Sequence, residues 1–436
     1  MTTPRFSVLI PTRDRPDTLR HTLSTVTAQA GADYEVVVAD NCGGPGTRAV
    51  VEQCGSPSVR YTRSDEVLPM AVNWERGLAL CSGEYVTVLG DDDGFMPSTL
   101  PLARKLIAAT AAPGMISWRA HVYWYPDTIA HWNRNRLFVN LGSSASRINS
   151  RPVLEQFYRS EISISLLPTI YSGFFHRRII DEARRRYRGF FVPSDTPPDV
   201  SSGILGLHLT DTFVHSARPL TIRGNSVRSN GTAQWMRSLG TSQRETYYRE
   251  ERVGMRGLTH DTLVPSPNLN ILIASCKLKC KELYFPGDAV LSLDPRTVVR
   301  DLLDSLNHDP DAYNDNLEDA KRLAAKLGMS LESRDIPARE RRERTARSGP
   351  ITNPQGVIDC LGVNGDLAGL ANIADAARLA ESLLPPAEQF LEARDAAPAE
   401  AARGIAYDTS VTARVVERPR SQLGMLLSGL LRGRKN

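Results

Sequence analysis

Short apolar runs alternate with amphipathic segments over the first 120 residues, and this alternation restricts the fold more than any other feature of the chain. Residues 6–10 (FSVLI) and 34–40 (YEVVVAD) are continuous apolar runs, as expected of strands buried on both faces. Residues 70–81 and the segment that follows Pro16 carry apolar side chains at helical spacing. The same reasoning predicts strands at 58–62, 85–89 and 114–119 and a helix at 98–110. Strands that alternate with helices predict an α/β fold with a mostly parallel sheet covered by helices on both faces.

Three consecutive aspartates end one of these strands. Residues 85–97 read YVTVLGDDDGFMP, so Asp91, Asp92 and Asp93 directly follow a buried run. Ligands of open α/β sheets bind at the carboxyl ends of the strands, and Asp40, at the end of the second strand, faces the same edge. Clustered carboxylates repel one another unless a cation neutralises them, and hard divalent metals prefer carboxylate oxygens. The triplet is therefore interpreted either as half of a metal–diphosphate site or as a solvated turn in which Asp93 binds backbone N–H groups.

The composition excludes several classes of protein. A net charge of +4 over 436 residues is too small for a nucleic-acid-binding polycation, so no nucleic-acid partner is expected. No apolar run approaches the ~18 residues of a membrane span. The six cysteines are scattered without a CxxC pair, and the N-terminus lacks the long apolar region of a signal peptide. These features predict a cytoplasmic protein with reduced thiols.

Three segments, taken in their order and spacing, resemble the family 2 glycosyltransferases with a GT-A fold. FSVLIPTRDRPDTLRHTLSTV resembles the first strand and helix of that family, and EVVVADNCG resembles its second strand. MAVNWERGLALCSGEYVTVLGDDDGFMP resembles its helix, strand and DxD motif, including Asn73 and Pro97. The resemblance is close over 1–100, looser to about 235 and absent beyond. It implies a Rossmann-like catalytic domain at 1–240, followed by a mainly helical C-terminal domain at 241–436.

The resemblance also implies roles for single residues. Asp92 would be the principal ligand of a Mn²⁺ or Mg²⁺ ion, although Gly90 stands where the common D-x-D-D pattern has its first aspartate, so the roles within the triplet stay open. A donor-binding arginine is expected at position 14, but the chain has Asp14 there, between Arg13 and Arg15. The remaining positions assigned to the nucleotide sugar, with Asp40 on the nucleobase, are Pro11, Thr12, Asp40, Asn73, Asp91 and Asp93.

Inverting members of the family use a carboxylate base about a hundred residues after the DxD motif. The acceptor hydroxyl attacks the anomeric carbon opposite the leaving diphosphate, and the base takes its proton in the transition state. The segment SDTPPDVSSGIL offers Asp195 and Asp199. Asp199 is preferred as the catalytic base because it directly precedes a helical run and follows two prolines. The alternative is that Asp199 only caps that helix.

Two further segments are candidates for ligand contacts. Residues 224–235 (GNSVRSNGTAQW) are expected to form a polar loop without helix or strand. The segment RGNSVRSNG (223–231) either closes over the donor, with Arg223 and Arg228 on the phosphates, or lies on the surface. A second candidate is an aromatic cluster that consists of Trp118, Trp124 and Trp132. Flat aromatic faces stack on sugars, so this cluster could form a platform for the acceptor. The alternative is that these side chains pack in the core, above all Trp118.

The sequence thus predicts a metal-dependent, inverting, hexosyltransferase-type glycosyltransferase. It would move a sugar from a nucleotide-diphosphate donor, a UDP-sugar by family habit, to a hydroxyl of a glycan or glycolipid in cell-surface polysaccharide synthesis. One alternative is a catalytically inactive GT-A-like protein that binds nucleotides or acts as a scaffold. The other is a nucleotidyltransferase, which is disfavoured because PTRDRPDT has no glycine after the first strand.

The last residues form a basic amphipathic tail. Residues 420–436 read RSQLGMLLSGLLRGRKN, with leucines at helical spacing before a cluster of arginine and lysine. Such a segment predicts peripheral contact with the inner face of the membrane. Packing of the tail against the helical domain of the same chain, or against a second copy in a homo-oligomer, is the alternative.

Overall fold

A nine-stranded sheet forms the centre of the N-terminal part. The computed structural model describes residues 4–252, 254–340, 346, 348–353, 357–387 and 394–395. The strands of this sheet are β1 (Phe6–Thr12), β2 (Tyr34–Asp40), β3 (Val59–Arg63), β4 (Tyr85–Val88), β6 (Met115–Trp118), β9 (Ala145–Asn149), β10 (Gly173–His176), β11 (Thr212–Ser216) and β15 (Arg394–Asp395). They lie in the order β15-β9-β11-β6-β10-β4-β1-β2-β3. β1 is parallel to β2 and β4, and β10 is antiparallel to β4 and β6, which confirms the predicted mostly parallel α/β sheet.

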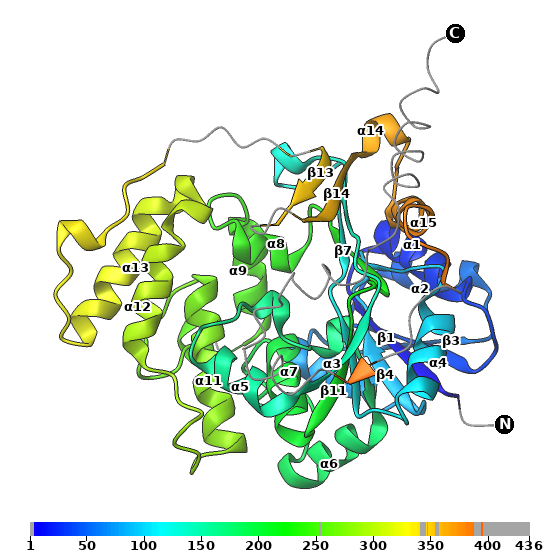
Figure 1. Cartoon of the computed structure of the whole chain (residues 1–436), viewed down its shortest axis with the longest axis horizontal. Coiled ribbons are helices and arrows are strands. Elements are labelled where there is room, and N and C mark those ends of the chain that lie inside the picture. The colour runs from blue at the N-terminus through cyan, green and yellow to red at the C-terminus, as the bar shows by residue number, and fades with distance from the viewer. Residues whose placement is uncertain are drawn as a thin grey trace.

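Helices cover both faces of this sheet (Figure 1). Within β1, Val8 and Ile10 pack against one set of helices and Leu9 against the other, which explains why the strand is apolar throughout. The first set comprises α1 (Pro16–Thr27), α2 (Pro45–Cys54) and α4 (Thr99–Ala109). The second set comprises α3 (Met70–Leu78), α5 (Ser150–Tyr158), α6 (Arg177–Tyr187) and α7 (Pro198–Leu209).

A second, six-stranded sheet lies beside the aspartate triplet. Its strands are β5 (Gly94–Phe95), β7 (His121–Trp124), β8 (Arg136–Asn140), β12 (Thr221–Asn225), β13 (Gly349–Thr352) and β14 (Ile358–Asn364). β12 is antiparallel to β5, which directly follows the triplet. The polar loop predicted at 224–235 is therefore partly wrong, because residues 221–225 form β12 and α8 spans Asn230–Trp235. Pairing with β7 orders the Gly224–Asn225 pair, although both residue types are depleted in strands.

The C-terminal helices extend the same core. They are α9 (Thr241–Glu250), α10 (Gly254–Leu258), α11 (Leu269–Tyr284), α12 (Pro295–Asp304) and α13 (Tyr313–Lys326). Figure 1 shows α11, α12 and α13 to one side of the sheet, and side chains of these helices share one hydrophobic cluster with α7 and with Leu9 of β1. The C-terminal region is thus mainly helical, as predicted, and the boundary at residue 240 remains a prediction.

The chain returns to the N-terminal part after these helices. β14 pairs with β8, and beyond the short α14 (Gly365–Ala368) α15 (Ile373–Ser382) packs against α1 (Figure 1). Arg218, only 1% exposed, donates a hydrogen bond to Glu381 over 2.7 Å and another to the Pro385 carbonyl. Because β5 also packs against α15, the helix lies behind the segment that carries the triplet.

The predicted tail at 420–436 lies outside the described residues, so its contacts stay a prediction. Within the described part of the chain, no helix is both long and apolar enough to traverse a bilayer.

Candidate functional site

Asp93 is held by groups of the protein itself. Its two carboxylate oxygens accept hydrogen bonds from the backbone N–H of Gly224 (2.7 Å) and of Gly90 (3.2 Å). The Tyr171 hydroxyl also hydrogen-bonds this carboxylate. Asp93 is 3% exposed, and burial raises its pKa against the effect of these donors. Asp93 therefore fastens β12 to the end of β4, which matches the backbone-binding role that the sequence left open for it.

Asp91 is neutralised by the first strand and helix. One of its oxygens accepts from the Thr12 hydroxyl over 2.7 Å, and the other forms an ion pair with Arg15 over 3.0 Å. Burial works against the charge of Arg15, but Asp91 and Asp92 outweigh burial and raise the pKa of Arg15. The arginine at the site is thus Arg15, one position beyond the expected position 14.

Asp92 has the least compensation of the three. Its Oδ2 accepts from the Ser226 hydroxyl over 2.6 Å, and its backbone carbonyl accepts from the Tyr125 hydroxyl over 3.0 Å. It forms no ion pair of its own within the residues that the structure describes. Burial and the neighbouring Asp93 and Asp91 raise the pKa of Asp92 well above its ordinary value, although Arg15 opposes them. A cation at this carboxylate would relieve the uncompensated charge.

The donor set fits a cation that is shared with a ligand. Across the described residues, no three or more His, Cys, Asp or Glu side chains gather in a way that could hold a metal ion. Mg²⁺ and related ions are commonly held by one or two carboxylates together with substrate phosphates, and Asp92 provides such a carboxylate.

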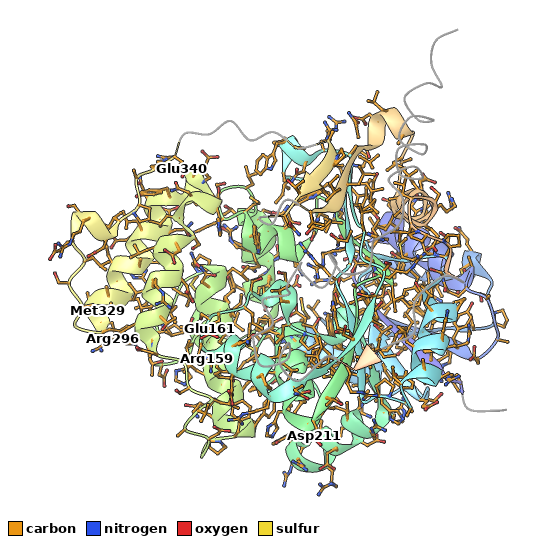
Figure 2. All side chains as sticks on the ribbon, viewed as in Figure 1. Arg159, Glu161, Asp211, Arg296, Met329 and Glu340 are labelled. Atoms are coloured by element: carbon orange, nitrogen blue, oxygen red, sulfur yellow. The ribbon has the colours of Figure 1, made fainter. Side chains whose placement is uncertain are left out.

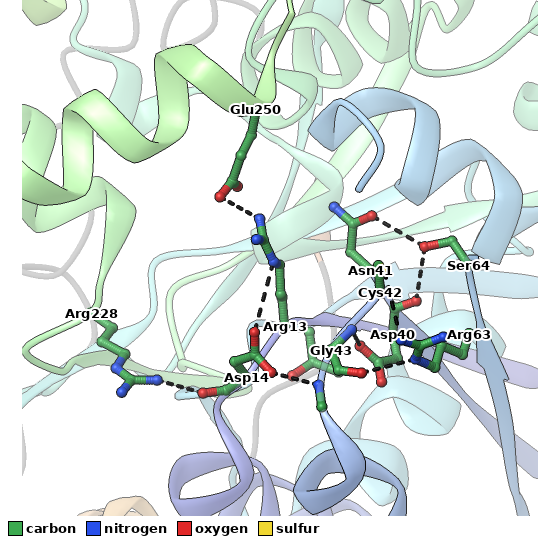
Figure 3. Close-up of polar contacts among 12 residues, drawn as sticks. Arg13, Asp14, Asp40, Asn41, Cys42, Gly43, Arg63, Ser64, Arg228 and Glu250 are labelled. Atoms are coloured by element: carbon green, nitrogen blue, oxygen red, sulfur yellow. Dashed lines mark hydrogen bonds and ion pairs between the residues drawn. The ribbon is translucent and has the colours of Figure 1, made fainter. Parts of the chain in front are cut away.

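Asp40 and Asn73 lie behind the strand ends rather than on an open surface. Asp40 is fully buried, and its carboxylate accepts hydrogen bonds from the Gly43 N–H (2.8 Å) and from the Tyr61 hydroxyl (2.6 Å). Figure 3 draws the contact with Gly43. Asn73 donates to the Ala39 carbonyl over 3.1 Å and accepts from Arg76. These contacts fix the carboxyl end of β2, while Pro11 is half-buried beside it on β1. Their roles toward a nucleotide stay predictions.

Arg228 and Glu250 contact the turn between β1 and α1 (Figure 3). Arg228 donates to the carbonyl of Asp14, whose carboxylate accepts from the Gly44 N–H over 2.6 Å. Arg13 forms an ion pair with Glu250 at the end of α9. Sequence reasoning included Arg228 but missed Glu250, because no motif marks a contact between residues so far apart in the chain.

The two candidate bases differ in their partners. Asp195 accepts from Lys279 of α11 over 2.6 Å. Asp199 forms no ion pair among the described residues, and burial raises its pKa although the Val200 N–H and Arg223 oppose the shift. Arg223 also acts on the pKa of Asp93. The cap position of α7 is Pro197, and Asp199 stands in the first turn, where its carboxylate accepts from the backbone N–H groups of Val200 and of Asp199 itself, so the capping alternative stays open.

The tryptophans predicted as an acceptor platform divide into two groups. Trp118 is 3% exposed, and its indole N–H donates to the Thr221 hydroxyl over 2.7 Å, so it packs in the core. Trp124 on β7 and Trp132 are half-buried, and their role toward an acceptor stays a prediction.

Comparisons with known proteins agree with this architecture. Residues 7–166 match the family Glycosyl transferase family 2, which confirms the predicted membership for this segment. Together with the strand order, the match places the N-terminal part in the GT-A fold class.

Individual relatives match over shorter stretches. Succinoglycan biosynthesis protein ExoO of Rhizobium meliloti is 28% identical over 111 residues, 26% of this chain and 31% of that protein. The GalNAc(5)-diNAcBac-PP-undecaprenol beta-1,3-glucosyltransferase of Campylobacter jejuni is 31% identical over 101 residues, 22% of this chain and 32% of that protein. The matches thus span about a third of the length of the curated relatives. The crystal structure of S. aureus TarS 1–349 in complex with UDP-GlcNAc has a TM-score of 0.40 and 14% identity, covering 75% of this chain and 93% of that one.

Gly224 offers a test of how tightly the site is built. A Cβ at Gly224 would lie 1.9 Å from the Asp92 carbonyl oxygen, so Gly224→Ala must push β12 away from the triplet. We expect a loss of ~1–3 kcal/mol in the free energy of unfolding, together with weaker nucleotide binding, because overpacked backbones shift. The control is Gly231→Ala in α8, where a Cβ meets no heavy atom closer than 4.0 Å. Urea unfolding and nucleotide calorimetry check both variants, and equal stability of the two would contradict the packing described.

Glu251 makes stability depend on pH. Its side chain is 4% exposed, and its carboxylate accepts a hydrogen bond from the Met70 N–H over 3.0 Å. Burial raises the pKa of Glu251 to about 7, and the negative charges of Glu250 and Asp195 add to this increase. The folded state therefore binds more protons than the unfolded state between the ordinary glutamate pKa of 4.5 and about 7, so stability falls as pH rises through this window.

Glu251→Gln should remove that loss. We expect the variant to gain up to about 3 kcal/mol over the native protein at pH 8 and little at pH 4.5. Urea unfolding at both pH values measures the difference, with Glu245→Gln as the control, an exposed residue of α9, the helix that ends directly before Glu251. A gain that is the same at both pH values would contradict the titration of Glu251.

Proposed function

We propose that this protein is a metal-dependent, inverting glycosyltransferase. It takes a sugar from a nucleotide-diphosphate donor and transfers it to a hydroxyl of a glycan or glycolipid acceptor in cell-surface polysaccharide synthesis. The family match over 7–166 supports the class of reaction. The uridine nucleotide of the donor is carried over from the family resemblance.

One observation carries the proposal: the Asp92 carboxylate is buried beside two other carboxylates at the end of β4 and has no ion pair among the described residues. A protein keeps such a costly group when a ligand neutralises it. Asp92 would hold a Mn²⁺ or Mg²⁺ ion together with the donor phosphates. When bound, the cation would neutralise negative charge on the departing diphosphate.

The chain supplies positive charge and a base around this carboxylate. Arg15 is directed at Asp91, and the exposed Arg223 lies near both Asp93 and Asp199, where it can meet a donor phosphate. Asp199 would accept the proton of the acceptor hydroxyl while the new C–O bond forms and the bond to the diphosphate breaks. A pKa raised by burial makes Asp199 a stronger proton acceptor than an exposed aspartate.

The names of two relatives support the class of acceptor. One refers to succinoglycan biosynthesis, and the other to a substrate linked to PP-undecaprenol. Both are compatible with a glycan or glycolipid acceptor and with a cytoplasmic enzyme that meets the inner face of the membrane through its tail. The alternative, a scaffold, would bind nucleotide without transferring or hydrolysing the donor.

The role of Asp92 is tested by metal removal. Chelation with EDTA should lower the affinity of the native protein for the UDP-sugar, whereas the Asp92→Asn variant should bind the donor weakly with or without EDTA. Ser226→Ala is the matched control, because it removes the hydroxyl bonded to Asp92 but leaves the carboxylate charge. Calorimetry with Mn²⁺ measures donor Kd. Donor binding by Asp92→Asn that still depends on metal would assign the ligand to another residue.

The role of Asp199 is tested by comparing it with Asp195. Asp199→Asn preserves the size of the side chain but cannot take the proton, so kcat should fall by ~10²–10⁴-fold while donor Kd stays near the native value. Asp195→Asn should affect stability through the loss of the Lys279 ion pair and leave kcat within a few-fold. Transfer and donor hydrolysis are measured for both variants. Normal turnover of Asp199→Asn would overturn its assignment as the base.

A further inference from the structure

A groove lies between the N-terminal part and the C-terminal helices, and none of the residues assigned to the donor lines it. Its volume is about 490 Å³, within the ~300–1,000 Å³ range of small-molecule sites. Residues 157–164 form one wall, and α11, α12 and the end of α8 form the others. Figure 2 labels Glu161, which lies on the first wall where the N-terminal part meets the helices.

Trp235 gives the groove an exposed aromatic face. This side chain is 54% exposed, although tryptophan is usually well buried. Its ring stacks on the imidazole of His308, with ring centroids 5.8 Å apart and planes within 2° of each other. The stack fixes the orientation of the indole, and the rest of the ring stays open. A fixed, open aromatic face is a surface on which the C–H face of a sugar ring can pack.

Carboxylates that can accept hydrogen bonds from sugar hydroxyl groups line the same groove. The carboxylates of Asp301 and Asp304 make no hydrogen bond or ion pair to any residue that the structure describes. Asp301, Asp304 and His308 follow one another at three- and four-residue spacing, so they share one side of α12 and the turn after it. An ionised carboxylate only accepts hydrogen bonds, and each sugar hydroxyl can donate one.

The charges of the groove disfavour an anionic ligand. Its charged lining residues are Glu161, Asp301, Asp304 and Asp309 against Arg237 and Lys277. Both cations are engaged: Arg237 bonds Asp319 over 2.5 Å, and Lys277, 4% exposed, bonds the Ser160 hydroxyl over 3.2 Å. Phosphates, nucleotides and anionic lipid headgroups would therefore meet net repulsion. A neutral carbohydrate matches both the aromatic face and the carboxylates.

We propose that this groove binds a neutral sugar unit of the acceptor glycan, and that this unit is a different one from the unit that receives the transferred sugar. The inference rests on the proposed function. The chain links the two places directly. Ser226 bonds Asp92, the Thr232 hydroxyl donates to Asn225 over 2.9 Å, and α8 then ends at Trp235. A glycan held at Trp235 stays bound to the enzyme while another part of it reaches the donor.

Four neutral tetrasaccharides serve as probes: maltotetraose, cellotetraose, laminaritetraose and chitotetraose. They are titrated to about 20 mM, enough to detect millimolar Kd values, into the full chain with ¹⁵N-labelled tryptophan. We expect at least one to shift the indole resonance of Trp235. Trp235→Ala should weaken that binding about tenfold, Trp235→Phe should restore most of it, and Asp304→Asn should weaken it about threefold. Leu283→Ala, exposed on α11 outside the groove, is the control and should change nothing.

The outcomes separate this inference from the proposed function. If no tetrasaccharide shifts Trp235, or if binding survives Trp235→Ala unchanged, the groove is not a glycan site. UDP binding with Mn²⁺ is measured on the same samples. Native protein that binds UDP but no tetrasaccharide contradicts the groove alone, and protein that binds a tetrasaccharide at Trp235 but no UDP contradicts the donor site alone. Should Trp235→Ala fail to fold, Trp235→Phe and Asp304→Asn still give the comparison.

Discussion

The burial of three adjacent carboxylates at the end of β4 is the constraint on which the rest of the site depends. Each of Asp91, Asp92 and Asp93 is at most 4% exposed, and burying uncompensated charge is among the costliest events in folding. The chain compensates the outer two with groups from distant elements, namely Arg15 and Thr12 for Asp91 and the Gly224 N–H for Asp93. The middle carboxylate receives a single hydroxyl bond. This uneven compensation leaves Asp92 as the carboxylate that the proposed metal site would use.

The same constraint explains why elements far apart in the sequence meet here. β12 must lie against β5 for Gly224 and Ser226 to reach the triplet, and the absence of a side chain at Gly224 permits that approach. α15 packs behind β5, where the ion pair of Arg218 with Glu381 holds it. Segments after residue 240 are therefore part of the support for the site, although they lie outside the region that resembles the family. Removing one partner of such a pair would leave a buried charge without compensation.

The sequence allows some of this arrangement to be predicted and hides the rest. Continuous apolar runs such as FSVLI identified the buried strands, because a strand covered on both faces must be apolar throughout. Asp91–Asp93 were found because carboxylates at a strand end are chemically unusual. β12 was missed since its Gly224–Asn225 pair carries no strand propensity and is ordered only by its neighbours. The Asp195–Lys279 ion pair joins residues 84 apart, and nothing local to either residue indicates such a contact.

That ion pair also separates two aspartates that the sequence leaves nearly equivalent. Both lie in one short segment, yet Asp195 forms an ion pair with a lysine of α11, while the charge of Asp199 is stabilised by the backbone N–H groups of Val200 and of Asp199 itself and by Arg223. A carboxylate already bound to an ammonium group is a poor proton acceptor, because accepting the proton would cost it that interaction. A carboxylate whose pKa is raised by burial gains by accepting one. Under the proposed function, the helical C-terminal region would contribute to the chemistry indirectly: Lys279 of α11 engages Asp195, so Asp199 would be the carboxylate of this segment that acts as the base.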